Sequence, residues 1–504
     1  MNLNGDFAKL GEMLKSRHEW LLVHSTGKSF SLLTNEIEIE IKHNKILVGF
    51  LDDKGFQTWR VRSFEQKGEE ILLNLARNFE KELEKIRLVP RVAASELSAV
   101  IELARLEKAN KIARLIIDET VGAKLVRVAL NEQNGRFAQI IFENRGSRQI
   151  AALSDVSDAT ATTENLITTA ILWLSKLQNR KKKPIETVWI LAEKKRAKAA
   201  QKLCALLRKN WQNKIEIFEI SGKSAKLQSE EKNASNKSLQ KLEPIVFKNL
   251  WREKTKEIQS SEKTQISRTA QEIVGIAPAN IDVVLTKQGE TLRFFGLPFA
   301  RVRQISGDEK VWFGIENKRQ ILSEKNFAEF LDLIEELKIY RHSETPNKRH
   351  EFYRLSPEAW LEAVLRHNIK LLDGNLILSP VYNQFRTGRD TIDLLALRGD
   401  GRLVVVELKV SPDREMIFQA ADYWRKIELQ RRAGNLRAAE IFGDLEISDE
   451  PTLCYLVAPF LSYHRDFDFL AQTASAEIEI YRFDLNENWR EDLKVLRRVE
   501  IGAM

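Results

Sequence analysis

Hydrophobic and polar residues alternate along many short segments of this 504-residue chain. Residues 36–42 read Glu-Ile-Glu-Ile-Glu-Ile-Lys, the strict alternation of a half-exposed strand. Apolar runs at 46–51 and 56–61 follow across short polar turns, so the pattern predicts a β-meander. We expect a helix over residues 69–86 to complete this small α+β unit, which spans residues 1–90.

The middle of the chain shows a different order of elements. After a helical segment, strands are expected over 125–130, 137–143 and 149–153, followed by helix, strand, helix and strand up to residue 220. Residues 91–220 are therefore predicted to form an α/β domain. The order is close to the one expected near the C-terminus, which suggests a degenerate copy of the same fold, but no Asp…Glu-x-Lys set lies on its paired strands.

Two further segments precede the C-terminal region. Residues 221–268 are rich in Ser, Lys, Glu, Gln and Asn, a composition typical of a polar linker. Residues 269–345 repeat the meander-then-helix pattern, with an amphipathic helix over 327–340. The final domain is expected over residues 346–504. The predicted class is α/β (α+β), with sheets flanked by helices.

Charged residues interrupt two apolar runs in this last domain. Residues 391–397 and 403–409 read as neighbouring strands joined by a Gly/Asp turn. Asp393 lies inside the first run, and Glu407 and Lys409 end the second and share one face. Because unpaired buried charges are costly, we expect these side chains to converge on one another and on a metal ion.

The pattern resembles the PD-(D/E)xK nuclease superfamily. The match runs from Asp393 through Glu407-x-Lys409 on the next strand to Gln419-x-x-x-Tyr423 on the following helix. The last element is similar to that of the RecB-type branch, and the whole resembles the C-terminal domain of the NucS mismatch endonucleases. The resemblance covers about the last third of the chain.

The resemblance implies a restriction-endonuclease-like mixed sheet flanked by helices and a Mg²⁺-dependent nuclease, with Mn²⁺ as a substitute. It implies that Asp393, Glu407 and the backbone carbonyl of Leu408 hold the metal through hard oxygens. Lys409 would orient the attacking water or stabilise developing charge. Gln419 and Tyr423 would steady the metal-bound water or a phosphate. One departure is Ile392, which stands where many members have Pro.

Residues outside the motif extend this expected site. Family members commonly place a helix glutamate near the metal, and either Glu358 or Glu362, one turn apart, could be that residue. A first-turn acid that favours the helix dipole is an equally good reading of each. Arg386 and Arg389 precede the Asp strand and are expected either to contact the DNA backbone or to be surface charges.

A Glu-x-Lys tripeptide alone carries little information in a chain in which 30% of residues are charged. The same Glu-Leu-Lys occurs at Glu336–Lys338, where helical spacing predicts a solvated face. The expected function is hydrolysis of DNA phosphodiester bonds; an endonuclease of repair or restriction and an exonuclease both stay open. A non-catalytic nucleic-acid-binding or scaffold protein that retains the fold, and an RNA-processing nuclease, stay open as alternatives.

Composition narrows these classes only slightly. Lys and Arg number 80 against 72 Asp and Glu, so the net charge of +8 is compatible with DNA binding. Cys204 and Cys454 lie in apolar segments, which predicts buried free thiols. No apolar run approaches the ~20 residues that span a bilayer, so we expect a cytoplasmic protein with no membrane contact. A homodimer or a partner protein, through the N-terminal region, stays open.

Overall fold

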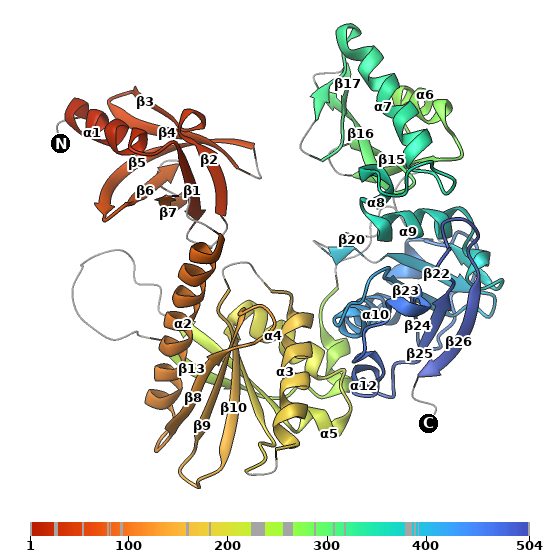
Figure 1. Cartoon of the computed structure of the whole chain (residues 1–504). Helices are drawn as coiled ribbons and strands as arrows, with labels where there is room; N and C mark the ends of the chain where they lie inside the picture. The colour runs from red at the N-terminus through yellow and green to blue at the C-terminus, as the bar shows by residue number, and fades with distance from the viewer. Residues whose placement is uncertain are drawn as a thin grey trace. The chain divides into compact units, whose positions relative to one another are not determined.

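The computed structural model has a mixed α/β fold in which mixed and antiparallel sheets are flanked by helices, as predicted (Figure 1). One compact unit comprises residues 1–166, 173–197 and 216–242, and the other comprises the remainder. The predicted five-part division stays a prediction. The structure describes residues 3–24, 29–52, 55–77, 80, 82–90, 94–157, 161–180, 183–222, 237–255, 266–286, 289–305, 308–316, 319–378, 386–387, 390–391 and 393–501.

The first sheet has the strand order β2-β1-β7-β6-β5-β4-β3, and helix α1 (Leu3–Lys15) contributes Leu10 and Leu14 to its core. The neighbouring strands whose register is described pair antiparallel. Its strands are β1 (Glu19–His24), β2 (Ser29–Leu33), β3 (Glu38–Lys42), β4 (Lys45–Asp52), β5 (Gly55–Lys67), β6 (Glu70–Arg77) and β7 (Glu82–Pro90), with a 3-10 turn η1 (Thr34–Glu36).

The helix predicted over residues 69–86 is wrong, because this segment forms β6 and most of β7. Ile71 pairs with Leu88 and Leu73 with Ile86 across the two strands, and all four side chains are buried. Alternate positions of β6 therefore face the core, which is the period of a strand. The burial comes from a neighbouring strand, which the local pattern does not reveal.

The second sheet has the order β13-β12-β11-β10-β9-β8. Part of the segment predicted as a polar linker supplies its edge strand β13 and the 3-10 turn η2 (Phe247–Arg252). The elements of this region are α2 (Ala94–Glu119), β8 (Lys124–Leu130), β9 (Phe137–Glu143), β10 (Gln149–Asp155), α3 (Thr163–Gln178), β11 (Val188–Glu193), α4 (Lys194–Cys204), α5 (Lys209–Gln212), β12 (Ile215–Gly222) and β13 (Lys237–Leu242).

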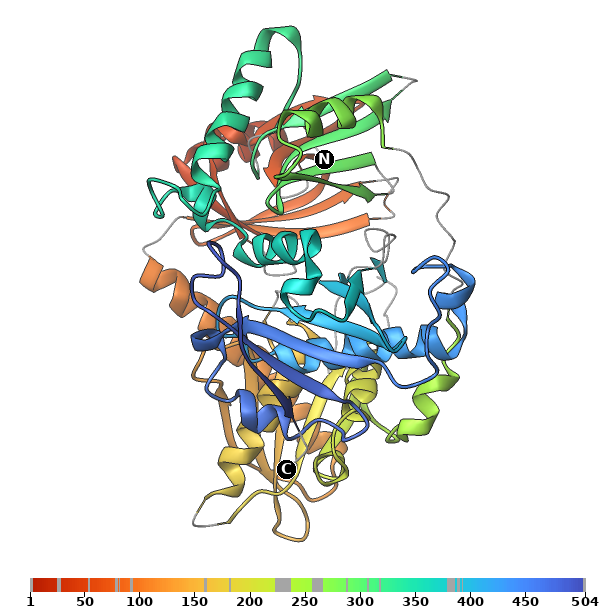
Figure 2. The ribbon, with the colours of Figure 1, turned by 90° about the vertical axis from the view of Figure 1, so that its right-hand side faces the viewer.

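The third sheet is an antiparallel meander, β14 to β18 in sequence order, with the predicted helix present as α7 (Figure 2). Phe330, Ile334 and Leu337 of α7 lie in its core. The elements are α6 (Arg268–Ile276), β14 (Ile281–Thr286), β15 (Gly289–Phe294), β16 (Leu297–Ile305), β17 (Asp308–Phe313), β18 (Gln320–Ile321), η3 (Glu324–Asn326) and α7 (Phe327–Tyr340).

The fourth sheet, in the C-terminal region, is mixed and has the order β19-β22-β23-β24-β25-β26. The elements are α8 (Glu351–Arg354), α9 (Pro357–His367), η4 (Ile369–Leu371), β19 (Leu376–Leu378), β20 (Arg386–Thr387), β21 (Asp390–Thr391), β22 (Leu394–Arg398), β23 (Leu403–Leu408), α10 (Met416–Arg432), α11 (Asn435–Ala438), β24 (Leu453–Pro459), η6 (Phe460–Ser462), α12 (Phe467–Ala471), β25 (Ile480–Leu485) and β26 (Val495–Ile501). Helix α10 begins at Met416, four residues after Pro412.

The second and fourth sheets share one order of elements. Each is preceded by a helix and has three antiparallel strands, a helix, a strand parallel to the third, a helical connection, and two more strands, the last pair antiparallel. The strand order across both sheets is the same within the described residues.

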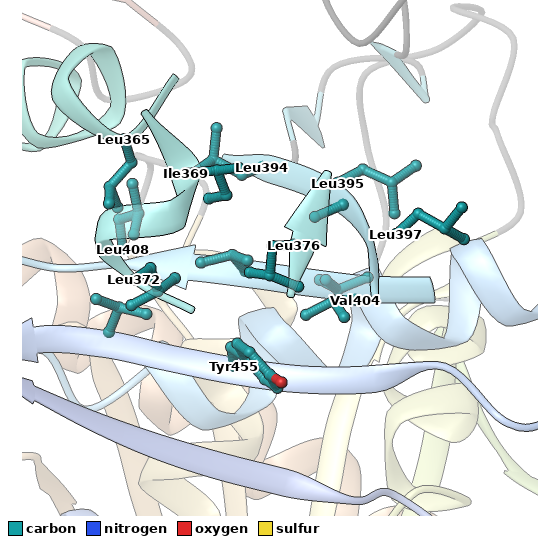
Figure 3. Packing of buried hydrophobic residues seen from close by; sticks show 14 of the residues in the cluster. Leu365, Ile369, Leu372, Leu376, Leu394, Leu395, Leu397, Val404, Leu408 and Tyr455 are labelled. Atoms are coloured by element: carbon teal, nitrogen blue, oxygen red, sulfur yellow. The ribbon is translucent and has the colours of Figure 1, made fainter. Parts of the chain in front are cut away.

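The core of the fourth sheet holds α9 against the hairpin of β22 and β23. Figure 3 shows Leu365 of α9 and Ile369 of η4 beside Leu394 and Leu408. Every residue of β23 is buried. These contacts fix the helix that carries both candidate glutamates relative to the strands that carry the motif.

Arg341, at the end of α7, joins the third sheet to the segment that leads into α9. Its fully buried guanidinium donates hydrogen bonds of 2.7–3.2 Å to the backbone carbonyls of Phe294, Phe295, Phe352, Leu355 and Ser356. Burial lowers the pKa of Arg341 to about 9, which leaves it charged at neutral pH. Charge-assisted bonds of this kind are strong, so they hold the segment firmly.

Two remaining expectations concern single features. Cys204 and Cys454 are free and buried, as predicted. Among the described helices, none combines the length and apolar character needed to span a bilayer.

Candidate active site

The β22–β23 hairpin brings Asp393 to the end of β23. The paired residues run from Leu397–Leu403 to Leu394–Val406, and Asp393 stands immediately before the first strand. Its Oδ2 accepts a hydrogen bond of 2.8 Å from the backbone N–H of Leu408. Asp393 is thus fixed beside the segment that carries Glu407 and Lys409. The carbonyl of Leu408 as a metal ligand stays a prediction.

Glu407 is a buried acid with one oxygen in use. Its side chain is 3% exposed, and Oε1 lies 2.9 Å from the Nζ of Lys409, which also lies 3.5 Å from the Oδ2 of Asp413. The Oε2 of Glu407 is buried and has no hydrogen-bond partner among the described residues. A buried carboxylate oxygen without a partner carries a large desolvation cost, so it marks unused acceptor capacity.

The electrostatics of the site follow from this burial. Burial raises the pKa of Glu407 to about 8, with the charge of Asp393 adding to the rise. Burial likewise raises the pKa of Asp393 to about 7, opposed by the Leu408 N–H and by Lys409. Burial alone would lower the pKa of Lys409, but Glu407 and Asp413 outweigh it and raise the pKa. The three motif side chains therefore act on one another directly.

Helix α9 adds both candidate glutamates to the same field. Glu362 and, more weakly, Glu358 raise the pKa of Asp393. Glu362 is itself held by two arginines, Arg366 at 3.3 Å and Arg293 of β15 at 3.5 Å. Glu362 is therefore the stronger electrostatic neighbour of the motif, whereas which glutamate contacts a metal stays a prediction.

Helix α10 supplies Gln419 and Tyr423. The Oε1 of Gln419 is buried without a hydrogen-bond partner in the described part of the chain. Tyr423 is partly buried against the core of the sheet, and the Nζ of Lys426 lies 5.5 Å from its ring centroid. Two oxygens of the predicted set, one on Gln419 and one on Glu407, thus have acceptor capacity that the protein leaves unused.

Of the two candidate DNA-binding arginines, only Arg386 belongs to the described residues. Arg386 pairs with Thr391 in the β20–β21 ladder, and the structure describes its backbone alone. Arg389 lies outside the described residues. Their role stays a prediction.

Sequence reasoning missed two residues at this site. Asp413 follows Lys409 by four positions and forms an ion pair with it, and Arg293, which pairs with Glu362, comes from a different sheet. Asp413 had a signal, because it lies in the Ser-Pro-Asp segment directly after the motif strand. Arg293 had none, since no local pattern connects residue 293 to residue 362.

The donor set decides whether these residues fit a divalent metal ion. Within the described ranges, no three His, Cys, Asp or Glu side chains converge closely enough to hold an ion. Mg²⁺ does not need such a cage, because it is commonly bound by one or two carboxylates together with water and substrate phosphate. Asp393, Glu407 and the unused Gln419 oxygen are hard oxygen donors, so the residues present fit Mg²⁺ bound in that way.

The second sheet provides an internal comparison by register. The first parallel pair there, Ala151–Val188, corresponds to Val404–Leu453 in the fourth sheet. This match places Ser154 at the position of Glu407, Ala138 at that of Asp393 and Val156 at that of Lys409. The Oγ of Ser154 donates to the carbonyl of Leu191 at 2.9 Å.

Comparisons with known proteins add little to this geometry. No protein-family model matches the chain, and no curated protein matches it. A solved structure described as EndoMS in apo form is similar over 37% of this chain and 82% of that chain, at 12% sequence identity and a TM-score of 0.15. A TM-score of this size carries no argument about fold or function.

Proposed function

We propose that the chain is a Mg²⁺-dependent nuclease that hydrolyses phosphodiester bonds of DNA at the Asp393–Glu407–Lys409 site. The observation that carries the proposal is the pair of neighbouring carboxylates on paired strands, each with a raised pKa and with Lys409 beside them. Such an arrangement is unfavourable for folding alone, because two acids share one desolvated site. Strongly perturbed acids with a specific charged partner are typical of functional sites.

Each side chain has a role in this proposal. Asp393 and Glu407 hold the metal, and Gln419 accepts a hydrogen bond from the attacking water through its otherwise unpaired Oε1. When bound, Mg²⁺ supplies charge neutralisation at the phosphate and an acidified water. Because its pKa is raised, Lys409 stays protonated and stabilises the phosphate charge rather than acting as a base. Hydrolysis joins the water oxygen to phosphorus and breaks one ester P–O bond, and a proton from the water ends on the leaving oxygen, which departs as a free hydroxyl group.

The second sheet has no catalytic role in this proposal. Its element order matches that of the fourth sheet, but its strands β9 and β10 carry no Asp…Glu-x-Lys set. The nearby acid Asp155 is fully engaged, by Arg196 at 2.7 Å and by hydrogen bonds from Ser157 and Ala161. A degenerate copy of the nuclease fold that stabilises the chain or contacts substrate fits these residues.

A non-catalytic scaffold is the second candidate, and specific contacts favour it. Lys409 already pairs with Glu407 and Asp413, and Glu362 with Arg293 and Arg366. These ion pairs would satisfy most of the charge without a metal. The predicted homodimer or partner protein has no support among the described contacts and is no part of either proposal.

The deciding experiment is cleavage by the purified chain of single-stranded, double-stranded and mismatched DNA, and of RNA, with Mg²⁺, Mn²⁺ or EDTA. We expect metal-dependent cleavage that falls at least ~100-fold in Asp393→Asn and Lys409→Ala. Glu336→Gln and Lys338→Ala are matched controls, because they alter the same Glu-Leu-Lys tripeptide on the exposed side of α7. Equal cleavage by wild type and site variants, or no cleavage by any of them, would support the non-catalytic scaffold. Cleavage of RNA alone would show that the substrate is RNA and not DNA.

A further inference from the structure

A basic hollow lies at the start of α9, outside the motif itself. Its cavity volume is about 440 Å³, and it is lined by Lys348, Arg349, Tyr353, Arg354, Pro357 and Arg490, here called the basic pocket. Four of these six side chains are cationic, and none is a carboxylate. A concave site of one charge sign concentrates counter-charge, so its ligand is an anion.

Two of the four cations of the basic pocket have no acid partner among the described residues. Arg349 and Arg354 are exposed and form no ion pair with the described residues. Lys348 pairs with Glu491 at 2.7 Å on the surface. The Nε of Arg490 is buried without a hydrogen-bond partner in the described part of the chain. The pocket therefore keeps net positive charge, carried by the two exposed guanidinium groups of Arg349 and Arg354.

Aromatic stacking holds the deepest cation in place. The guanidinium carbon of Arg490 lies 4.5 Å from the ring centroid of Trp489, 4.8 Å from Tyr353 and 5.1 Å from Trp360. A guanidinium fixed in this way has already lost its rotamer freedom, so it binds an anion at a lower entropic cost.

The backbone at the start of α9 adds to the positive potential. Pro357 occupies the first turn, and Ser356 before it makes no side-chain cap hydrogen bond and has a φ of 42°. The Ser356 side chain thus leaves the first N–H groups of this 11-residue helix without a cap. The helix starts at Pro357, which lines the same pocket as the four cations. Helix N-termini favour phosphate groups for this reason.

The basic pocket adjoins the candidate active site through Glu358. This residue follows Pro357, which lines the pocket, on helix α9, and Leu365 of the same helix packs in one core with Leu394 and Leu408 of the motif strands. Helix α9 therefore contributes both to the pocket and to the surroundings of Asp393.

We propose that the basic pocket binds a phosphate group of the nucleic-acid strand, through Arg349, Arg354 and Arg490, and sets which bond of that strand reaches the motif. The inference rests on the proposed function only in taking this strand as the one that is cut. The phosphate is either a terminal phosphate or one of the backbone, and these share the same recognition chemistry.

Binding measurements test the pocket separately from catalysis. Asp393→Asn protein is titrated in EDTA with a fluorescent single-stranded DNA oligonucleotide and its duplex, each with a 5′-phosphate, a 3′-phosphate or hydroxyl ends. The test variant adds Arg349→Gln and Arg354→Gln, both at exposed positions that leave the fold intact. The control adds Arg268→Gln and Lys310→Gln, which remove the same charge from exposed sites of the third-sheet region.

We expect the test variant to bind about tenfold more weakly than the control, with a salt dependence reduced by about one to two phosphate contacts. A loss confined to oligonucleotides with one terminal phosphate identifies that terminus, and an equal loss for all identifies a backbone phosphate. Equal affinity of test and control variants, or no binding by the parent protein, overturns the pocket. If the test variant binds more weakly than the control but the wild type shows no metal-dependent cleavage, the pocket stands and the proposed nuclease activity is overturned.

Discussion

Glu407 is the residue in which function and stability conflict most clearly. It lies one residue before the end of β23, a strand of otherwise Leu and Val residues that are all buried, and one of its oxygens has no partner among the described residues. Its raised pKa of about 8 records how strongly the fold disfavours its charge. An apolar or neutral residue would suit this position better if folding were the only requirement.

This conflict predicts a pH-dependent gain in stability for Glu407→Gln in EDTA. Since the folded-state pKa is raised, the wild type is helped by protonated Glu407 at pH 5 and loses that help as pH rises through about 8. The variant does not titrate there. We expect the difference in free energy of unfolding, variant minus wild type, to be larger at pH 9 than at pH 5 by about 1–3 kcal/mol.

Urea unfolding monitored by circular dichroism at both pH values measures this difference. Glu336→Gln is the control, because its exposed acid should show no such trend. A constant difference between Glu407→Gln and wild type across the pH range would contradict the burial of a charged Glu407.

The same two acids predict the pH profile of cleavage. Asp393 and Glu407 must lose their protons before their oxygens can hold a metal, and their pKa values are about 7 and about 8. We expect activity at low Mg²⁺ to rise from pH 6 to pH 8.5. Because metal binding competes with protons, this acid limb should move to lower pH as the Mg²⁺ concentration increases. An acid limb that is independent of Mg²⁺ would show that other groups limit the rate.

At the scale of elements, helix α9 is positioned by the turn between β15 and β16. Gly296 in this turn has a φ of 76°, and a Cβ there would lie 2.0 Å from the carbonyl oxygen of Ala359. Phe295, beside it, stacks on Trp360 with ring centroids 5.7 Å apart. The third sheet thus contacts the helix that carries Glu358 and Glu362 and also supplies Arg293.

Gly296→Ala should therefore lower stability and activity together. The new methyl group would push α9 from the turn and strain a left-handed backbone, at a cost of about 2 kcal/mol or more. Gly275→Ala in α6 is the matched control, because nothing lies within 4 Å of its Cβ, and it should be neutral or stabilising by up to ~1 kcal/mol. Thermal unfolding and cleavage assays of both variants measure this; a neutral Gly296→Ala would show that the close contact is not maintained.

Local sequence pattern predicted the elements whose partners are near in the chain. The hairpin around Gly401, the β9 strand and α7 were recognisable because periodicity and turn residues specify them. It failed for residues 69–86, whose Leu-rich and Glu-rich sequence suits a helix until its strand partners bury it. In the site, Asp393, Glu407 and Lys409 were found by their unusual burial pattern, whereas Arg293 reaches Glu362 across 69 residues and gave no signal.

At the scale of the whole molecule, the C-terminal region depends on residues far upstream. Arg208 N–H donates to the carbonyl of Thr473 at 2.8 Å, and Ser475 N–H donates to Leu206 at 2.7 Å. Trp211 contacts Phe469 edge-on at 5.8 Å between ring centroids. The compact unit that contains the candidate site accordingly includes residues 198–215.

A fragment of residues 346–504 should therefore unfold more easily than the same region in the full chain. It lacks Arg341, Phe295 and the 198–215 segment, so buried carbonyls and apolar side chains lose their partners. We expect a broad, low-temperature transition by calorimetry and aggregation, compared with a cooperative transition for the full chain. A sharp, stable transition for the fragment would establish residues 346–504 as an independent domain, as the sequence pattern predicts.

The hydrogen bonds from Arg341 to five backbone carbonyls affect how well the chain tolerates mutation. Its five carbonyl partners surround a planar guanidinium, and all six bonds come from three nitrogens. Lysine keeps the charge but offers one nitrogen, so it would leave several of these carbonyls without a donor. In a library in which every residue is substituted, even Arg341→Lys should therefore be strongly depleted. The loss of Arg341 should look like the loss of a catalytic residue, although Arg341 takes no part in catalysis.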